Sequence, residues 1–132
     1  MKTLIIILSL LILVACGGDT KSGVSEAAIS GGNPANGEKL FDNRCLACHA
    51  IEADEERVGP SVAGLATESA KIINDSNYTG EAQTAEAYIL ESIIDPEAYL
   101  TEGYAPVMST NYGDQLSEQE LADLVAYLMT FK

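Results

Sequence analysis

The most constraining feature of this 132-residue sequence is the pentapeptide Cys45-Leu46-Ala47-Cys48-His49. It places two of the three cysteines three positions apart and follows them directly with the only histidine of the chain. Two thiols at this spacing lie about one helical turn apart. They can therefore each bond to the same flat group, while the neighbouring imidazole reaches a metal at its centre. Any fold for this chain must bring a ligand to this short segment.

The pentapeptide is the attachment signature of a c-type haem. Each thiol can add to one haem vinyl group, and His49 then becomes the proximal iron ligand. Three other interpretations compete with haem. A zinc site needs a fourth ligand beyond Cys45, Cys48 and His49, a thioredoxin-like redox pair needs a βαβ context, and a simple disulfide leaves the histidine unexplained. We predict one haem c, bound covalently through two thioethers.

A low-spin electron-transfer haem needs a second axial ligand, and the sequence contains no second histidine. Met108 lies in a loop stiffened by Pro106, fifty-nine residues after His49, where a thioether can reach over the open haem face. The alternative is that Met108 only fills a gap between apolar side chains. Met129 falls within the last predicted helix, and we expect it to pack in the core. A neutral thioether ligand raises the reduction potential of the iron.

The N-terminus predicts export. Residues 1–15 begin with a positive charge and continue as an apolar run to Val14, which is the pattern of a secretory signal. The run is too short to span a bilayer, which takes about 20 apolar residues. Its end, Ala15-Cys16, resembles a bacterial lipoprotein signal, in which cleavage precedes a lipid-bearing cysteine. An ordinary signal peptide cleaved near Ala15 is the alternative. We expect Cys16 to anchor the protein to the outer face of the cytoplasmic membrane or to the outer membrane.

Composition divides the remaining chain into a tether and one domain. We predict a lipid-anchored flexible tether at residues 16–33, because Gly and Ser dominate it. Residues 34–132 would then form an all-α haem domain of three to four helices. The stretches 50–83 and 95–116 show little apolar periodicity, and loops of that length are uncommon unless they are functional. We therefore expect them to wrap around the cofactor, which supplies the missing core.

Local signals define the expected helices. The first leads from Pro34 into the Cys pair. A second begins after Thr84 and ends before Asp95-Pro96, because a proline disfavours helical backbone in the residue before it. The last begins with a capping box formed by Ser117 and Glu120. It continues with apolar residues at helical spacing.

The charge of the chain is strongly negative. Seven Lys and Arg against twenty Asp and Glu give −13, and removal of Lys2 with the signal gives −14. Few cations are available to neutralise phosphates, so we predict no binding to nucleic acid. The negative field would steer the protein toward a basic surface on a redox partner. Solubility alone is the other explanation. An acidic cluster lies close to the haem motif in sequence: Glu52, Asp54, Glu55 and Glu56.

Residues 34–132 resemble class I cytochrome c. The resemblance implies that the first and last helices cross at Gly37, Phe41 and Tyr127, that the carbonyl of Pro60 accepts a hydrogen bond from His49, and that Met108 is the axial ligand. The family often has a proline directly after that methionine, whereas Ser109 stands here. The candidates for the apolar haem pocket are Val62, Leu65, Ile93, Leu100 and Tyr104, and each could equally be plain core. Arg57 could pair with a haem propionate or lie on the surface.

The segments 88–96 and 111–128 are similar, less specifically, to the haem c domains of terminal oxidase subunit II and of nitric oxide reductase. The sequence as a whole predicts a single-electron carrier between membrane-associated redox complexes, which is not an enzyme and binds no small-molecule substrate. Two alternatives remain. One is a haem enzyme or gas sensor with a labile sixth ligand, and the other is a fixed haem subunit of a larger oxidoreductase.

Overall fold

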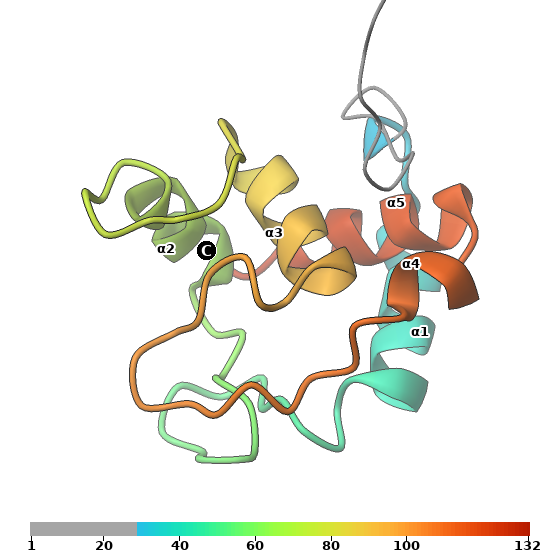
Figure 1. Ribbon diagram of the computed structural model, residues 1–132. Coiled ribbons are helices and arrows are strands. Elements are labelled where there is room, and N and C mark those ends of the chain that lie inside the picture. The colour runs from blue at the N-terminus through green and yellow to red at the C-terminus, as the bar shows by residue number, and fades with distance from the viewer. Residues whose placement is uncertain (1–28) are drawn as a thin grey trace, which may run out of the picture.

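The computed structural model describes residues 29–132 as an all-α domain (Figure 1). Its five helices are α1 (Pro34–Arg44), α2 (Leu65–Ile72), α3 (Ala85–Ile94), α4 (Tyr112–Gln115) and α5 (Glu118–Leu128). No strand occurs among these described residues. The predicted all-α class is confirmed, whereas the expectation of three to four helices is too low by at least one. The predicted signal at 1–15, the lipid site at Cys16 and the tether up to residue 28 lie outside the described residues.

Helices α1 and α5 form the main packing contact of the domain (Figure 1). A side chain at Gly37 would overlap the backbone carbonyl of Asp123 on α5, so only glycine lets the two backbones approach this closely. One turn further along, the rings of Phe41 and Tyr127 lie 5.6 Å apart at a tilted angle. Phe41 is almost fully buried. The first and last helices therefore cross at the three residues that the resemblance indicated.

The start of α1 is tied to the middle of α5 by Asp123. The carboxylate of Asp123 accepts a hydrogen bond from the backbone N–H of Asn33 at 2.7 Å and another from the Gln119 amide at 2.8 Å. The Asn33 bond holds the pKa of Asp123 below its usual value. Asn33 in turn caps α1, accepting from the N–H of Ala35 at 3.0 Å. The buried Asp123 carboxylate therefore joins the N-terminal end of α1 to α5.

Two helix starts agree with the sequence signals. The Thr84 hydroxyl accepts from the N–H of Ala87 at 3.1 Å, and α3 runs from the next residue to Ile94, directly before Asp95-Pro96. Ser117 and Glu120 form a complete capping box at the start of α5. Both predictions are confirmed, because in each case a short polar side chain satisfies the free backbone N–H groups of the first turn.

The two helices without such signals are α2 and α4, which lie in the stretches expected to be loops. Helix α2 begins after Gly64, whose backbone is left-handed at φ 69° and provides no side-chain cap. Helix α4 is a single turn after Asn111, whose side chain does not cap it. Neither segment contains a run of apolar residues long enough to show a helical period.

The core lies where α3 packs on α5 and α5 packs on α1. Its most deeply buried large apolar side chains are Phe41, Ile89, Leu121, Leu124 and Val125. Met129 is partly buried and packs against this core, as predicted. Among residues 29–132, no helix has the length and apolar character needed to cross a bilayer.

Candidate haem site

The Cys-x-x-Cys-His segment continues directly from the end of α1. Cys45 is the C-cap residue of α1, and its N–H bonds to the carbonyl of Phe41 at 2.8 Å. The N–H groups of Cys48 and His49 then bond to the carbonyl of Cys45 at 3.0 and 2.9 Å. The segment is therefore wound into turns whose position is set by α1. Since Phe41 is packed against α5, the crossing of the two helices determines the position of Cys45, where the haem-attachment segment begins.

The His49 ring is held by the loop that contains Gly59 and Pro60. Its Nδ1 lies 2.8 Å from the carbonyl oxygen of Pro60, the pairing that the resemblance indicated. When Nδ1 donates this proton, Nε2 is left free to bind a metal. A Cβ atom on Gly59 would lie 2.5 Å from Cε1 of His49. Gly59 is therefore a site residue that sequence reasoning missed, since only a nonlocal contact reveals its role.

A cavity of about 340 Å³ lies beside this segment. That volume is within the range of small-molecule and cofactor pockets. Its walls come from the end of α1 and the turns after it, the loop before Pro60, α3, the loop after α3 and the start of α4. The cavity brings together all the candidate cofactor-binding residues of the described chain: Cys45, Cys48, His49, Pro60 and Met108. In Figure 1 the loop before Pro60 and the loop after α3 extend on the same side of α3.

The lining of the cavity differs in part from the expected pocket. Leu100 and Tyr104 line it as expected, but Val62 and Ile93 are buried in the core and Leu65 packs against that core. Aromatic residues that were not predicted occupy much of the wall: Tyr88, Tyr99 and Tyr112. Tyr88 and Tyr99 are also in edge contact with each other, with ring centroids 6.3 Å apart. The site is thus a largely apolar and aromatic chamber with sulfur and imidazole groups at its edge.

The electrostatics of the site reflect this apolar lining. Burial raises the pKa of the Cys45 thiol to about 11, with Cys48 adding to the rise and the Arg44 guanidinium opposing it. The thiol of Cys45 is therefore protonated at neutral pH. Burial also raises the pKa values of Tyr88 and Tyr112 above their usual range, so both phenols stay neutral.

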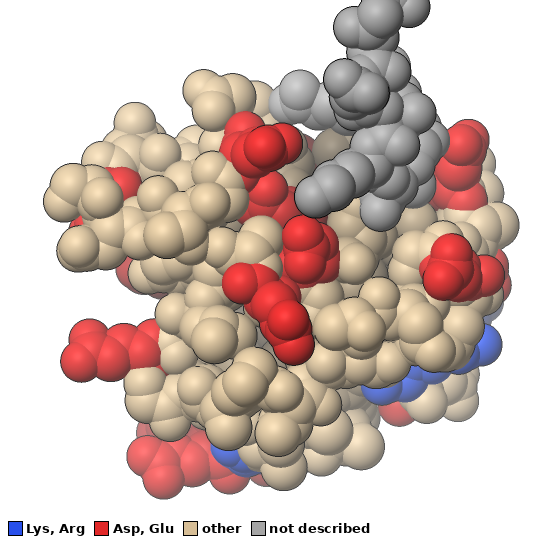
Figure 2. Space-filling view, viewed as in Figure 1, with Lys and Arg blue, Asp and Glu red and all other residues tan. Residues whose placement is uncertain are grey.

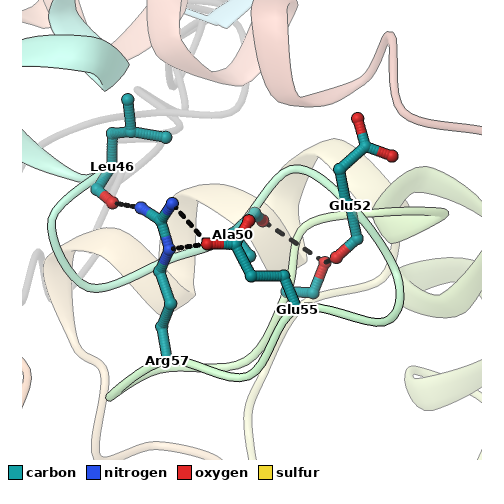
Figure 3. Close-up of polar contacts among 6 residues, drawn as sticks. Leu46, Ala50, Glu52, Glu55 and Arg57 are labelled. Atoms are coloured by element: carbon teal, nitrogen blue, oxygen red, sulfur yellow. Dashed lines mark hydrogen bonds and ion pairs between the residues drawn. The ribbon is translucent and has the colours of Figure 1, made fainter.

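Arg57 lies outside the cavity wall. Its guanidinium forms an ion pair with Glu55 at 2.6 Å and donates to the carbonyl of Leu46 (Figure 3). Through these two contacts Arg57 joins the loop before Gly59 to the backbone between the two cysteines.

The chemistry of the cavity fits a covalently attached haem. The thiols of Cys45 and Cys48 and the imidazole of His49 line the cavity. The thioether of Met108 reaches it from the loop after α3, and the rest of the lining is mostly apolar. Within residues 29–132, no group of three or more His, Cys, Asp or Glu is arranged to hold a metal ion by itself. That observation weighs against zinc in the described domain. Fold and site together define a small all-α protein built to bind haem at its Cys-x-x-Cys-His segment.

Comparison with known proteins places this class in one family. The sequence model of the family described as "Cytochrome c" matches residues 34–132, so the chain belongs to the cytochrome c family. It is 36% identical over 118 residues to "Cytochrome c2 iso-1" of Rhodospirillum centenum, covering 76% of this chain and 97% of that one. It is also 30% identical over 101 residues to "Cytochrome c-554(547)" of Halothiobacillus neapolitanus, covering 76% and 99% respectively.

Membership in this family establishes the general function. Cytochromes c contain covalently attached haem c and transfer electrons between redox proteins, and this chain is an electron carrier of that kind. The family also points to a location outside the cytoplasm.

Proposed function

We propose that this protein is a lipid-anchored monohaem cytochrome c that passes single electrons between membrane-associated redox complexes. The observation that supports this most directly is the single cavity lined by Cys45, Cys48, His49 and Met108. Met108 lies fifty-nine residues after His49 in sequence, yet it lines the same space as the Cys-x-x-Cys-His segment. Haem, when bound there, would supply the change between ferric and ferrous iron.

The residues of the chain divide the work of holding the cofactor. Cys45 and Cys48 would form the two thioether bonds. His49 would be the proximal ligand, with Pro60 holding its ring and increasing its basicity. Met108 would be the sixth ligand and favour the reduced state. The tyrosines of the cavity would exclude water from the iron. Fewer solvent dipoles would then have to reorient at each electron transfer, which lowers the reorganisation energy.

Replacing Met108 tests the ligand assignment. Met108→Ala in the holoprotein should abolish the sulfur-to-iron charge-transfer absorption and lower the reduction potential, because the neutral thioether is lost. Met129→Leu is the matched control, since Met129 packs against the core rather than lining the cavity. An unchanged low-spin spectrum in Met108→Ala would show that another group ligates the iron.

A haem enzyme or gas sensor with a labile sixth ligand is the second candidate. It would share the cavity but leave the iron open to small molecules. Purified ferrous protein that remains low-spin and does not bind carbon monoxide supports the carrier, whereas ready binding supports the second candidate. The absence of a second histidine from the whole sequence disfavours peroxidase-type acid–base catalysis.

The proposed anchor rests on the sequence alone. Cleavage after residue 15 would expose Cys16 for lipid attachment, and residues 16–33 would connect it to the haem domain. Mass spectrometry of the protein from its native membrane should show an acylated N-terminal Cys16. Cys16→Ala should release the protein into the soluble fraction, with its haem spectrum unchanged.

The proposed partner is a redox protein with a basic docking surface, such as a terminal oxidase or reductase. On the face shown in Figure 2, Asp and Glu form several separate patches, whereas Lys and Arg occupy only small areas. Opposite charges should accelerate encounter, so electron transfer to the partner should slow by about tenfold or more between low and physiological salt. A rate independent of salt would contradict steering.

A fixed subunit would carry out the same chemistry without diffusing. Extraction in mild detergent should separate a free shuttle from other redox proteins, whereas a fixed subunit should co-purify with them in constant proportion.

A further inference from the structure

The haem-attachment segment and the loop that holds His49 run alongside each other. Gly59 N–H donates to the carbonyl of Cys48 at 2.8 Å, and Val62 N–H donates to the carbonyl of Ala50 at 2.8 Å. The His49 ring and the Pro60 carbonyl pair between these two bonds, also at 2.8 Å. Residues 48–50 and 59–62 are therefore joined at three successive points.

Arg57 makes the same connection at the N-terminal end of this pairing, through its side chain. Nη1 donates to the carbonyl of Leu46, which lies between the two cysteines. Nε and Nη2 both donate to one oxygen of Glu55, at 2.9 and 2.6 Å (Figure 3). The planar guanidinium is thus oriented by Glu55 and directed at Leu46. The Arg57 side chain is 28% exposed and that of Glu55 46%, so the contact is partly shielded.

We propose that Arg57, oriented by Glu55, is a positioning residue for the proximal ligand. It clamps the backbone between Cys45 and Cys48 to the loop that begins two residues before Gly59, and so keeps the Pro60 carbonyl against Nδ1 of His49. The proposal rests on the proposed function, in which His49 ligates iron. It adds a residue that acts on the iron through two others and touches neither haem nor metal.

Two effects of removing Arg57 have opposite signs, which makes the proposal testable. A weaker bond from His49 Nδ1–H to Pro60 makes the imidazole less basic, which favours ferrous iron and raises the reduction potential. Loss of a positive charge near the site, acting by itself, favours ferric iron and lowers the potential. A positioning role therefore predicts a rise, and a purely electrostatic role predicts a fall.

The experiment uses the holoprotein with Arg57→Ala, Arg57→Lys and Glu55→Gln. Lys71→Ala is the matched control, because Lys71 forms an ion pair of the same length, 2.6 Å, with Glu68 on α2. The direct readout is the exchange rate of the His49 Nδ1 proton with solvent, followed by NMR in the diamagnetic ferrous state. The second readout is the reduction potential, and far-ultraviolet circular dichroism confirms that each variant is folded.

In Arg57→Ala the Nδ1 proton should exchange about tenfold faster, in keeping with the loss of a charge-assisted hydrogen bond. The potential should rise. Arg57→Lys keeps the positive charge, but an ammonium group cannot hydrogen-bond to Leu46 and Glu55 at once with the geometry of a planar guanidinium. The exchange rate and the reduction potential should therefore rise less than in Arg57→Ala. Glu55→Gln should accelerate exchange by about threefold, and Lys71→Ala should leave both readouts unchanged.

Exchange rates in Arg57→Ala and Arg57→Lys equal to those of Lys71→Ala would overturn the clamp. A fall in potential in Arg57→Lys, which keeps the positive charge, would overturn it as well. If Arg57→Ala does not fold, Arg57→Lys and Glu55→Gln decide alone. Failure of the proposed function is recognised separately, because the unmodified holoprotein would then lack a low-spin spectrum with histidine ligation. A normal spectrum with unresponsive variants rejects only the clamp.

Discussion

The crossing of α1 and α5 and the cavity beside it are held together in different ways. At the crossing, backbones touch at Gly37 and aromatic rings fill the contact at Phe41 and Tyr127, with almost no exposed surface at Phe41. Around the cavity, the loop that holds His49 is fixed mainly by hydrogen bonds to the segment that carries the two cysteines. The first region can stabilise itself by packing. The second depends on polar contacts and on whatever fills the cavity.

The largest expected effect is at the crossing. Gly37→Val would force a branched side chain into the Asp123 carbonyl and the Cβ of Tyr127, which would lie only 2.7 Å from the first added carbon. We expect a loss of about 3 kcal/mol or more in the free energy of unfolding, measured by denaturant titration of the holoprotein. Gly31→Ala is the control, because an added Cβ there meets nothing within 4 Å. A mild effect at Gly37 would mean that the crossing adapts as easily as a loop.

A smaller global effect but a larger effect on the haem is expected at the cavity. Gly59→Ala adds a Cβ against the His49 ring and should displace either the ring or the loop. We expect a loss of about 1–3 kcal/mol in the free energy of unfolding, together with a changed haem spectrum. Gly113→Ala should change neither quantity appreciably, because its added Cβ makes only ordinary contacts at 3.6 Å or more. A normal spectrum in Gly59→Ala would show that the ring does not need this close contact.

The smallest of the three effects concerns pH. Asp123 has a lowered pKa in the folded protein, so the unfolded chain binds its proton more readily as the pH falls. Its contribution is therefore present above about pH 4 and is lost as the pH falls through the lower, folded pKa. Asp123→Asn should cost about 1–2 kcal/mol at neutral pH and flatten the loss of stability below pH 4.

Denaturant titrations between pH 2.5 and 7 would measure this difference. Because Asp123 belongs to the crossing, its replacement should leave the reduction potential unchanged. A shifted potential would show that the two regions are coupled more strongly than their packing indicates.

The parts of the fold that were predictable have local causes. Thr84 and the Ser117–Glu120 pair satisfy backbone groups within one turn, so the starts of α3 and α5 are evident in the sequence. Helix α2 begins instead at a left-handed Gly64, which gives no side-chain signal. Its stability comes from packing against α3, and a single sequence does not display that contact.

The same distinction applies to the candidate site. The Cys-x-x-Cys-His spacing predicts haem attachment directly. Met108, on a loop stiffened by Pro106, was the predicted second axial ligand. The roles of Gly59, Tyr88 and Tyr99 arise only when distant segments meet, so spacing did not reveal them. The sequence leaves open whether Arg57 pairs with a haem propionate or lies on the surface. Its bonds to Glu55 and Leu46 depend on loop geometry that composition does not encode.

Helix α1 has a mechanical consequence for the reach of the protein. Its N-terminal end is pinned to α5 through Asn33 and Asp123, and its C-terminal end becomes Cys45. Eleven residues of helix span about 16 Å. The contact that holds the N-terminal end of α1 and the cysteine at which the cofactor would attach are thus the two ends of one stiff helix. A shift of the start of α1 along α5 would therefore move Cys45, and with it the edge of the cavity, by a similar distance.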